Sequence, residues 1–163
     1  MESKLDREEV MLTFYSDLYL TQLQNYQFGS SKFSTHPLQA IESIKQNSNA
    51  HPIIVLYDQH VIGFLILEKL PHQSIYGDYH GVILFRSFSL DAKYRGRGLS
   101  KIVIQTLIPF VHTHLPNETT IVLTVNQANA AAIGLYKRMG FNDTGRTFLG
   151  KKGLQYVFEK RIV

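Results

Sequence analysis

Residues 87–111 constrain the fold of this 163-residue chain more than any other stretch, because they predict a strand, a glycine turn and a helix in immediate succession. The apolar strand ends at Leu90, and Asp91-Ala92-Lys93-Tyr94 leads into the turn Arg95-Gly96-Arg97-Gly98-Leu99-Ser100. A strand that feeds a helix through so short a turn indicates a sheet with helices on its faces. From Leu99 onward, apolar residues recur at the spacing of one buried helical face, at Ile102, Val103, Leu107, Phe110 and Val111.

The turn itself is suited to binding phosphate. Gly96 and Gly98 let backbone N–H groups approach a ligand closely, because no Cβ intervenes. The helix start adds unpaired N–H donors and a partial positive charge, and Arg95 and Arg97 add two permanently charged donors. The turn is neither G-x-G-x-x-G, because Lys101 occupies the last position, nor a P-loop. We therefore predict a pyrophosphate-binding turn, with a plain glycine turn carrying solvated arginines as the alternative.

Composition is that of an ordinary globular protein, so we expect a single domain over residues 1–163. No apolar run is long enough to span a membrane, and the mixed charges of residues 1–9 are unlike a signal peptide. These features favour a cytoplasmic location. Without cysteine the chain has no disulfide, thiol nucleophile or thiolate metal site. Its net charge of +4 is scattered along the sequence, so charge alone does not favour nucleic acid.

The remaining pattern predicts a mixed sheet with helices on its faces. Pro109 is expected to kink or shorten the helix that contains it, residues 69–80 to form a loop, and residues 145–152 to form a hairpin turn. The expected strands are 10–15, 52–57, 61–68, 81–90, 119–125, 141–148 and 154–160, and the expected helices are 16–27, 37–44, one from Leu99, and 126–139 ended by Gly140.

This order of elements, together with two motifs, resembles the GNAT superfamily of acyl-CoA N-acyltransferases. The segment from Arg95 to Ser100 matches the R/Q-x-x-G-x-G/A turn of that superfamily, with the small residue Ser100 where Gly or Ala is usual. Asn129-Ala130-Ala131-Ala132-Ile133-Gly134-Leu135-Tyr136 matches N-x-x-A-x-x-L-Y, and Gly140-Phe141 matches the closing G-F. Two motifs in the right order, with a strand between them, are more specific than either motif alone.

The resemblance implies a mostly antiparallel α/β fold with about seven strands, helices on both faces, and two central strands that splay apart. The pantetheine arm of acetyl-CoA would lie in the gap. By the same resemblance, Phe88, Ser89 and Leu90 would contact the arm and the acetyl group, Arg95, Gly96, Arg97, Gly98, Leu99 and Ser100 would hold the pyrophosphate, Asn129 would contact the arm, and Tyr136 would lie near the thioester sulfur.

The implied activity is transfer of an acetyl group from acetyl-CoA to a primary amine by direct attack, with Tyr136 as general acid. The acceptor would be a small molecule or a protein amine, and the chain a monomer or homodimer without metal, nucleic acid or membrane as a partner. A non-catalytic acyl-CoA-binding or regulatory domain is the alternative. Tyr136 has a second interpretation as a packing residue, and Asn129 has one as a helix cap.

The sequence does not decide which residues bind and deprotonate the acceptor. The expected strand 81–90 contains no carboxylate to serve as general base, although Glu68, Asp78 or His80 could act through water. Arg86 could face the acceptor or be a charge at a strand edge. Because loops commonly carry specificity, we expect the loops Gly29–His36 and Lys69–His80 to line the acceptor entrance.

Overall fold

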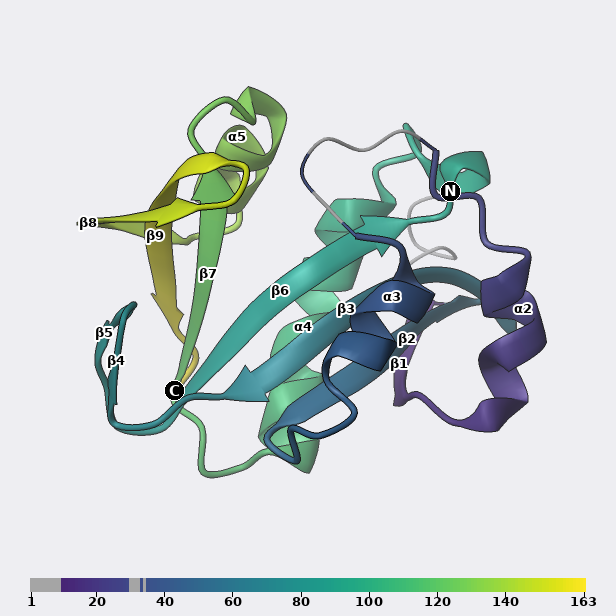
Figure 1. Cartoon of the computed structure of the whole chain (residues 1–163), viewed down its shortest axis with the longest axis horizontal. Helices are drawn as coiled ribbons and strands as arrows, with labels where there is room; N and C mark the ends of the chain where they lie inside the picture. The colour runs from purple at the N-terminus through teal and green to yellow at the C-terminus, as the bar shows by residue number, and fades with distance from the viewer. Residues whose placement is uncertain (1–9, 30–32, 34) are drawn as a thin grey trace.

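The computed structural model describes residues 10–29, 33 and 35–163. A seven-stranded sheet runs in the order β1-β2-β3-β6-β7-β9-β8, and β4 pairs with β5 separately (Figure 1). The strands are β1 (Val10–Phe14), β2 (Ala50–Tyr57), β3 (His60–Lys69), β4 (Gln73–Ser74), β5 (Gly77–Asp78), β6 (Val82–Leu90), β7 (Thr120–Asn126), β8 (Asn142–Gly150) and β9 (Gly153–Arg161). The helices are η1 (Asp17–Tyr19), α2 (Leu20–Gln24), α3 (Pro37–Ser43), η2 (Ala92–Tyr94), α4 (Leu99–His114) and α5 (Ala130–Arg138).

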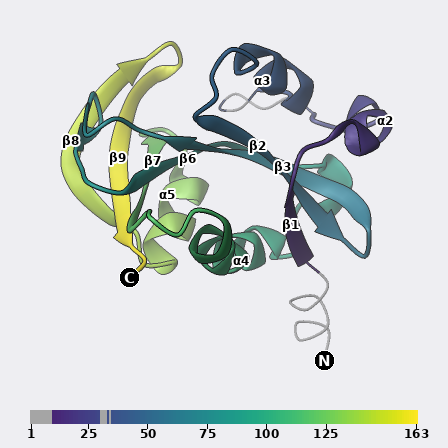
Figure 2. The same cartoon turned by 90° about the horizontal axis from the view of Figure 1, so that it is seen from below.

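Helices cover both faces of the large sheet, as expected from the sequence. Figure 2 shows α2 and α3 on one face and α4 and α5 on the other. The apolar stripe of α4 is buried, with Val103 and Leu107 fully inaccessible to solvent. It joins inward-facing residues of the sheet in one large apolar cluster, whereas the opposite face carries two smaller clusters.

The two central strands splay apart, which confirms the expected fold class. Among the described residues β6 and β7 are the one parallel pair of the large sheet, and their pairing covers Val82–Leu84 opposite Thr120–Val122. Beyond Leu84 the strands diverge, as Figure 1 shows, and each keeps only its outer neighbour, β3 or β9. The register between β3 and β6 shifts near the divergence, where Ser87 has a positive φ of 58°. A bulge of this kind redirects a strand and its backbone groups.

The expected helix over 16–27 is wrong in its length, because only residues 17–24 are helical. The N–H of Gln27 bonds to the carboxylate of Asp91, 3.1 Å away, instead of continuing the helix. The expected helix over 126–139 likewise begins later, at Ala130. The side chain of Asn126 accepts from the N–H of Ala128, so this residue forms a turn before the helix.

Pro109 does not shorten α4, which continues to His114. The proline faces solvent, while Leu107, Phe110 and Val111 around it are buried and hold the helix in place. The segment expected as a loop over residues 69–80 contains the small β4–β5 hairpin. The hairpin turn expected over residues 145–152 is shorter than predicted, because β8 continues to Gly150 and only Lys151 and Lys152 form the turn, with Gly150 paired to Gly153.

Candidate functional site

A cleft of about 530 Å³ opens where β6 and β7 diverge. Its walls come from the unpaired part of β6, the turn before α4, the end of β7 and the first turns of α5 (Figure 1). It brings together, from the residues expected at the site, Phe88, Ser89, Leu90, Arg95, Gly96, Gly98, Leu99, Ser100, Asn129 and Tyr136. Arg97 does not line it; its guanidinium lies over the ring of Tyr94, 5.1 Å from the centroid.

The turn before α4 is shaped to receive a ligand on its backbone. Gly96 and Gly98 both have positive φ, 77° and 74°, which residues with a Cβ rarely adopt. A Cβ built on either glycine would meet no atom within 4 Å, so the space above the turn is open. Gly98 caps the 16-residue α4, whose first N–H groups lack partners within the helix. The turn therefore fits a pyrophosphate through backbone donors.

The Arg95 side chain is bound to the protein itself. Its Nε donates to the carbonyl of Leu90 at 3.0 Å, and its Nη2 donates to the carbonyl of Phe28. The N–H of Ala92 donates to the carbonyl of Gln27 at 2.7 Å in the same region. Arg95 thus connects the segment after α2 to the glycine turn, a contact that the sequence motif alone does not reveal.

Tyr136 has features of both interpretations offered by the sequence. Its ring makes edge contacts with Phe85 and Phe141, at centroid distances of 6.2 and 5.8 Å. It also lines the cleft, and its hydroxyl has no hydrogen-bond partner among the residues that the structure describes. Burial raises the pKa of the Tyr136 hydroxyl, so it stays protonated at neutral pH. A protonated hydroxyl facing a cleft is available as a proton donor.

Asn129 caps α5 and lines the cleft at the same time. Its side-chain oxygen accepts from the N–H of Ala132 at 3.2 Å, which is the capping interaction considered from the sequence. Ser89 also has a protein partner, because its hydroxyl lies 2.9 Å from that of Tyr26. Burial raises the pKa of Tyr26. This buried pair ties the segment after α2 to the β6 wall of the cleft.

Several lining residues were not among those expected. Their only signal in the sequence is position, since the last residues of β7 and the β8–β9 turn face the gap once the strands splay. They are Phe85, Ser87, Thr124, Val125, Asn126, Ala131, Ala132, Leu135, Lys152 and Gln155. Arg86, for which the sequence left the acceptor side and a strand edge open, lines the cleft as well.

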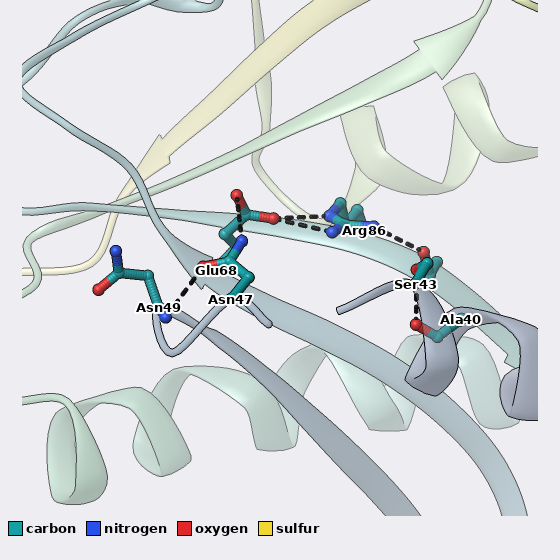
Figure 3. A network of polar contacts seen from close by, with 7 residues as sticks. Ala40, Ser43, Asn47, Asn49, Glu68 and Arg86 are labelled. Atoms are coloured by element: carbon teal, nitrogen blue, oxygen red, sulfur yellow. Dashed lines mark hydrogen bonds and ion pairs between the residues drawn. The ribbon is translucent and has the colours of Figure 1, made fainter. Parts of the chain in front are cut away.

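Of the two loops predicted to line the acceptor entrance, one contributes a residue to the cleft and the other does not. Phe33 of the loop Gly29–His36 lines the cleft, while residues 30–32 and 34 lie outside the described residues. The segment Lys69–His80, including Asp78, does not line it. His80 stacks on His72 at 3.9 Å. Glu68 pairs with Arg86 on the α3 face of the sheet (Figure 3). The acceptor role of both loops stays a prediction.

The described residues show neither a metal site nor a membrane-spanning helix. No group of three or more His, Asp or Glu side chains is placed to hold a metal ion there. No helix within residues 10–29, 33 and 35–163 has the length and apolar character needed to cross a membrane.

Sequence and structure comparisons agree on one family. The chain is 29% identical over 153 residues to an uncharacterized N-acetyltransferase, YbbJ, of Bacillus subtilis, covering 92% of this chain and 96% of that protein. It is 28% identical over 137 residues to the spermine/spermidine N(1)-acetyltransferase of the same species, covering 83% and 85%.

Solved structures share the fold. The aminoglycoside acetyltransferase AAC(6')-Ib, in complex with coenzyme A and kanamycin, superposes with a TM-score of 0.74 at 19% identity over 93% of this chain and 94% of that one. The spermidine N-acetyltransferase of Vibrio cholerae, in complex with CoA and spermine, superposes with a TM-score of 0.66 at 17% identity over 94% and 96%. Residues 15–141 match the acetyltransferase (GNAT) family itself, so the chain belongs to that family.

Proposed function

We propose that this chain transfers the acetyl group of acetyl-CoA to a primary amine by direct attack, and that Tyr136 is the general acid. As a GNAT acetyltransferase the chain is an acetyl-CoA-dependent N-acetyltransferase, with acetyl-CoA as cosubstrate. The observation that carries the finer proposal is that one cleft joins the glycine turn, the unpaired edge of β6 and the hydroxyl of Tyr136.

The residues present fit acetyl-CoA. The turn over residues 95–100 offers backbone N–H groups to the pyrophosphate, and the unpaired edges of β6 and β7 offer backbone groups to the pantetheine arm. Phe88, Ser89 and Leu90 line the same cleft and would contact the arm and the acetyl end. Arg95 contributes through its backbone, because its side chain is bound to protein carbonyls.

Acetyl-CoA supplies a thioester whose carbonyl the amine attacks. A β6 backbone N–H in the unpaired stretch can stabilise the negative charge that develops on the carbonyl oxygen. The Tyr136 hydroxyl, which is protonated at neutral pH, would donate its proton to the departing sulfur. Its ring contacts with Phe85 and Phe141 fix the direction in which the hydroxyl points.

The acceptor amine is expected to bind as its free base, since no carboxylate is among the described residues that line the cleft. The relatives named above act on amines: one is named for spermine and spermidine, and AAC(6')-Ib was solved with kanamycin. A small-molecule primary amine is therefore the acceptor class that we propose.

The Tyr136→Phe variant tests the general-acid role. Phenylalanine keeps the packing on Phe85 and removes only the hydroxyl, so we expect a normal melting temperature and normal acetyl-CoA affinity. The turnover number should fall by about 10²–10⁴-fold, the usual range for a lost general acid. Thiol release from acetyl-CoA in the presence of an amine measures it, under conditions in which chemistry limits the rate.

Tyr156→Phe is the matched control, because Tyr156 packs against the same apolar cluster but does not line the cleft. It should leave turnover unchanged. Full turnover in Tyr136→Phe would make Tyr136 a packing residue. Acetyl-CoA binding without thiol release for any amine would favour the non-catalytic alternative.

A further inference from the structure

One ion pair stands out on the α3 face of the sheet, beside the cleft. Figure 3 shows Glu68 of β3 between Arg86 of β6 and Asn47 of the segment after α3. A single oxygen, Glu68 Oε1, accepts from Arg86 Nε at 3.0 Å and from Nη2 at 2.8 Å. The other oxygen, Oε2, accepts from Asn47 Nδ2 at 3.4 Å, and Asn47 Oδ1 accepts from the N–H of Asn49 at 3.0 Å. Glu68 is thus held from two sides and fixes the Arg86 side chain.

The way in which Glu68 binds leaves one edge of the guanidinium available. Glu68 takes the side edge, formed by Nε and Nη2. On the end edge, formed by Nη1 and Nη2, the partner within the described chain is the Ser87 hydroxyl, 3.4 Å from Nη1. A guanidinium end edge offers two parallel N–H donors, the geometry that binds carboxylate or phosphate in bidentate fashion.

Arg86 lies where an acceptor would meet the acetyl group. It is two residues beyond Leu84, the last β6 residue paired with β7, and two before Phe88. It lines the cleft, and its side chain is 33% exposed, so a ligand can reach it. If Phe88 and its neighbours contact the acetyl group as proposed, the Arg86 end edge would lie close to the point of reaction.

The charged residues that line the cleft also favour a ligand with a carboxylate or phosphate group. Its charged lining residues are Arg86, Arg95 and Lys152, all basic, and no described Asp or Glu lines it. Two carboxylates lie next to lining residues, and both have partners: Glu68 is bound to Arg86 and Asn47, and Asp91, which follows Leu90, accepts from the N–H groups of Gln27 and Lys93. A polycationic amine would find no described carboxylate lining the cleft to pair with, which disfavours its binding.

We infer that the acceptor is an amine that also carries an oxyanion group, carboxylate or phosphate, and that this group binds the end edge of Arg86. Glu68 is the positioning residue that holds Arg86 in place. The inference rests on the proposed function and narrows it, because it separates this chain from relatives named for spermine or solved with kanamycin.

The first experiment compares matched acceptors with the parent protein. Glycine and L-alanine are each assayed beside their amides, and glucosamine 6-phosphate beside glucosamine, with spermidine and kanamycin as polycations. We expect at least one oxyanion-bearing amine to exceed its partner without the oxyanion by roughly 10-fold or more in kcat/KM, about 1.4 kcal/mol. The amino-acid and sugar-phosphate arms separate a carboxylate from a phosphate. Preference for spermidine, kanamycin or the partners without an oxyanion would overturn the inference while leaving acetyl transfer intact.

The second experiment assigns the preference to Arg86. Arg86→Gln should lower kcat/KM for the oxyanion-bearing amine by about 10–100-fold. It should leave kcat/KM for the partner without the oxyanion, and the KM for acetyl-CoA, unchanged. Arg86→Lys should give a kcat/KM for the oxyanion-bearing amine between those of the parent and Arg86→Gln, because lysine keeps the charge but loses the two-donor edge. Arg161→Gln, a change of exposed charge at the end of β9, is the control and should change neither acceptor. An equal loss for both acceptors in Arg86→Gln would show a structural role and overturn the inference.

A binding measurement separates failure of this inference from failure of the proposed function. If no amine releases thiol, acetyl transfer fails, and thermal shift of the CoA-saturated protein with N-acetylglycine and N-acetylglycinamide then decides about Arg86. Stabilisation by the acid alone, lost in Arg86→Gln, supports the site. Equal stabilisation by both compounds, or by neither, contradicts it.

Discussion

The two faces of the sheet differ in how their apolar residues are arranged. On the α4 and α5 face, buried side chains from β1 to β9 form one continuous cluster. On the α2 and α3 face they form two clusters, one around Ile66 and one around Leu84. In the β3–β6 register Ile66 lies opposite Arg86 and Glu68 lies opposite Leu84, so the ion pair stands at the boundary between those clusters.

The difference indicates a functional division between the two faces of the sheet: one face mainly stabilises the fold, and the other carries groups that bind a ligand. A continuous apolar layer stabilises the fold through burial. A partly exposed ion pair contributes little to stability, and well-packed apolar residues in its place would often stabilise a protein at least as well. The charges on the α3 face are therefore better explained by binding than by folding. Four substitutions test this division, from the largest expected effect to the smallest.

Leu107→Ala should have the largest effect on stability. Leu107 is fully buried in the continuous cluster under α4, and removing a buried leucine side chain costs about 2–5 kcal/mol of unfolding free energy. Leu38→Ala is the matched change on the other face, where Leu38 of α3 is only partly buried. It should cost about 1 kcal/mol, the usual loss for a point substitution. Urea unfolding of both variants measures the contrast, and equal losses would contradict the division between the faces.

Gly98→Val should abolish most acetyl-CoA binding. The substitution strains a positive φ and places a branched side chain over the backbone donors of the turn, so we expect a loss of about 100-fold or more in affinity, near 2.7 kcal/mol. Gly145→Val carries the same strain, since Gly145 also has a positive φ of 81° and open space around it, but it lies in β8 outside the cleft. Titration calorimetry with acetyl-CoA should show normal affinity for Gly145→Val. Tight binding by a folded Gly98→Val would place the pyrophosphate elsewhere.

The sequence predicted those parts of the site whose geometry is local. Gly96 and Gly98 signal a turn because few other residues adopt its backbone, and Tyr136 falls on the cleft because it follows Asn129 by two helical turns. The succession of the seven strands of the large sheet along the chain was likewise predicted from turn residues and apolar runs. The helix starting at Leu99 also began where its apolar spacing predicted.

Contacts between distant residues could not be predicted. Arg95 bonds to Phe28, 67 positions away, and the pairing of Arg86 with Glu68 depends on a bulged register between two strands. The helix after η1 ended early for a similar reason, because the carboxylate of Asp91 competes for the N–H of Gln27. Tertiary contacts of this kind override local pattern, and a single sequence does not specify them.

Arg86→Gln should change stability little, in contrast to its expected effect on acceptor choice. The paired side chains of Arg86 and Glu68 are 33% and 21% exposed, so solvent screens their interaction. We expect a change of about 1 kcal/mol or less in the free energy of unfolding. Urea unfolding beside Leu107→Ala gives the comparison directly. A loss as large as that of Leu107→Ala would assign the pair to the fold.

Glu118→Gln should have the smallest effect, and its sign is informative. Glu118 has a side chain only 5% exposed, Oε1 lies 3.9 Å from Nζ of the exposed Lys69, and Oε2 has no hydrogen-bond partner within the described chain. Burial raises the pKa of its carboxyl, and Lys69 opposes that shift only in part. The folded state therefore holds this proton more tightly than the unfolded state, and stability falls as pH rises above the unfolded pKa, about 4.3.

Glutamine removes this titration, so Glu118→Gln should be slightly more stable than the parent at pH 7, and the advantage should shrink as the pH falls toward 5. Urea unfolding at both pH values measures the difference, with Glu42→Gln as the control because Glu42 is exposed. If Glu118→Gln instead destabilises the protein at pH 7, the ionised carboxylate supports the fold through Lys69, and partly buried charges here contribute to stability as well as to binding.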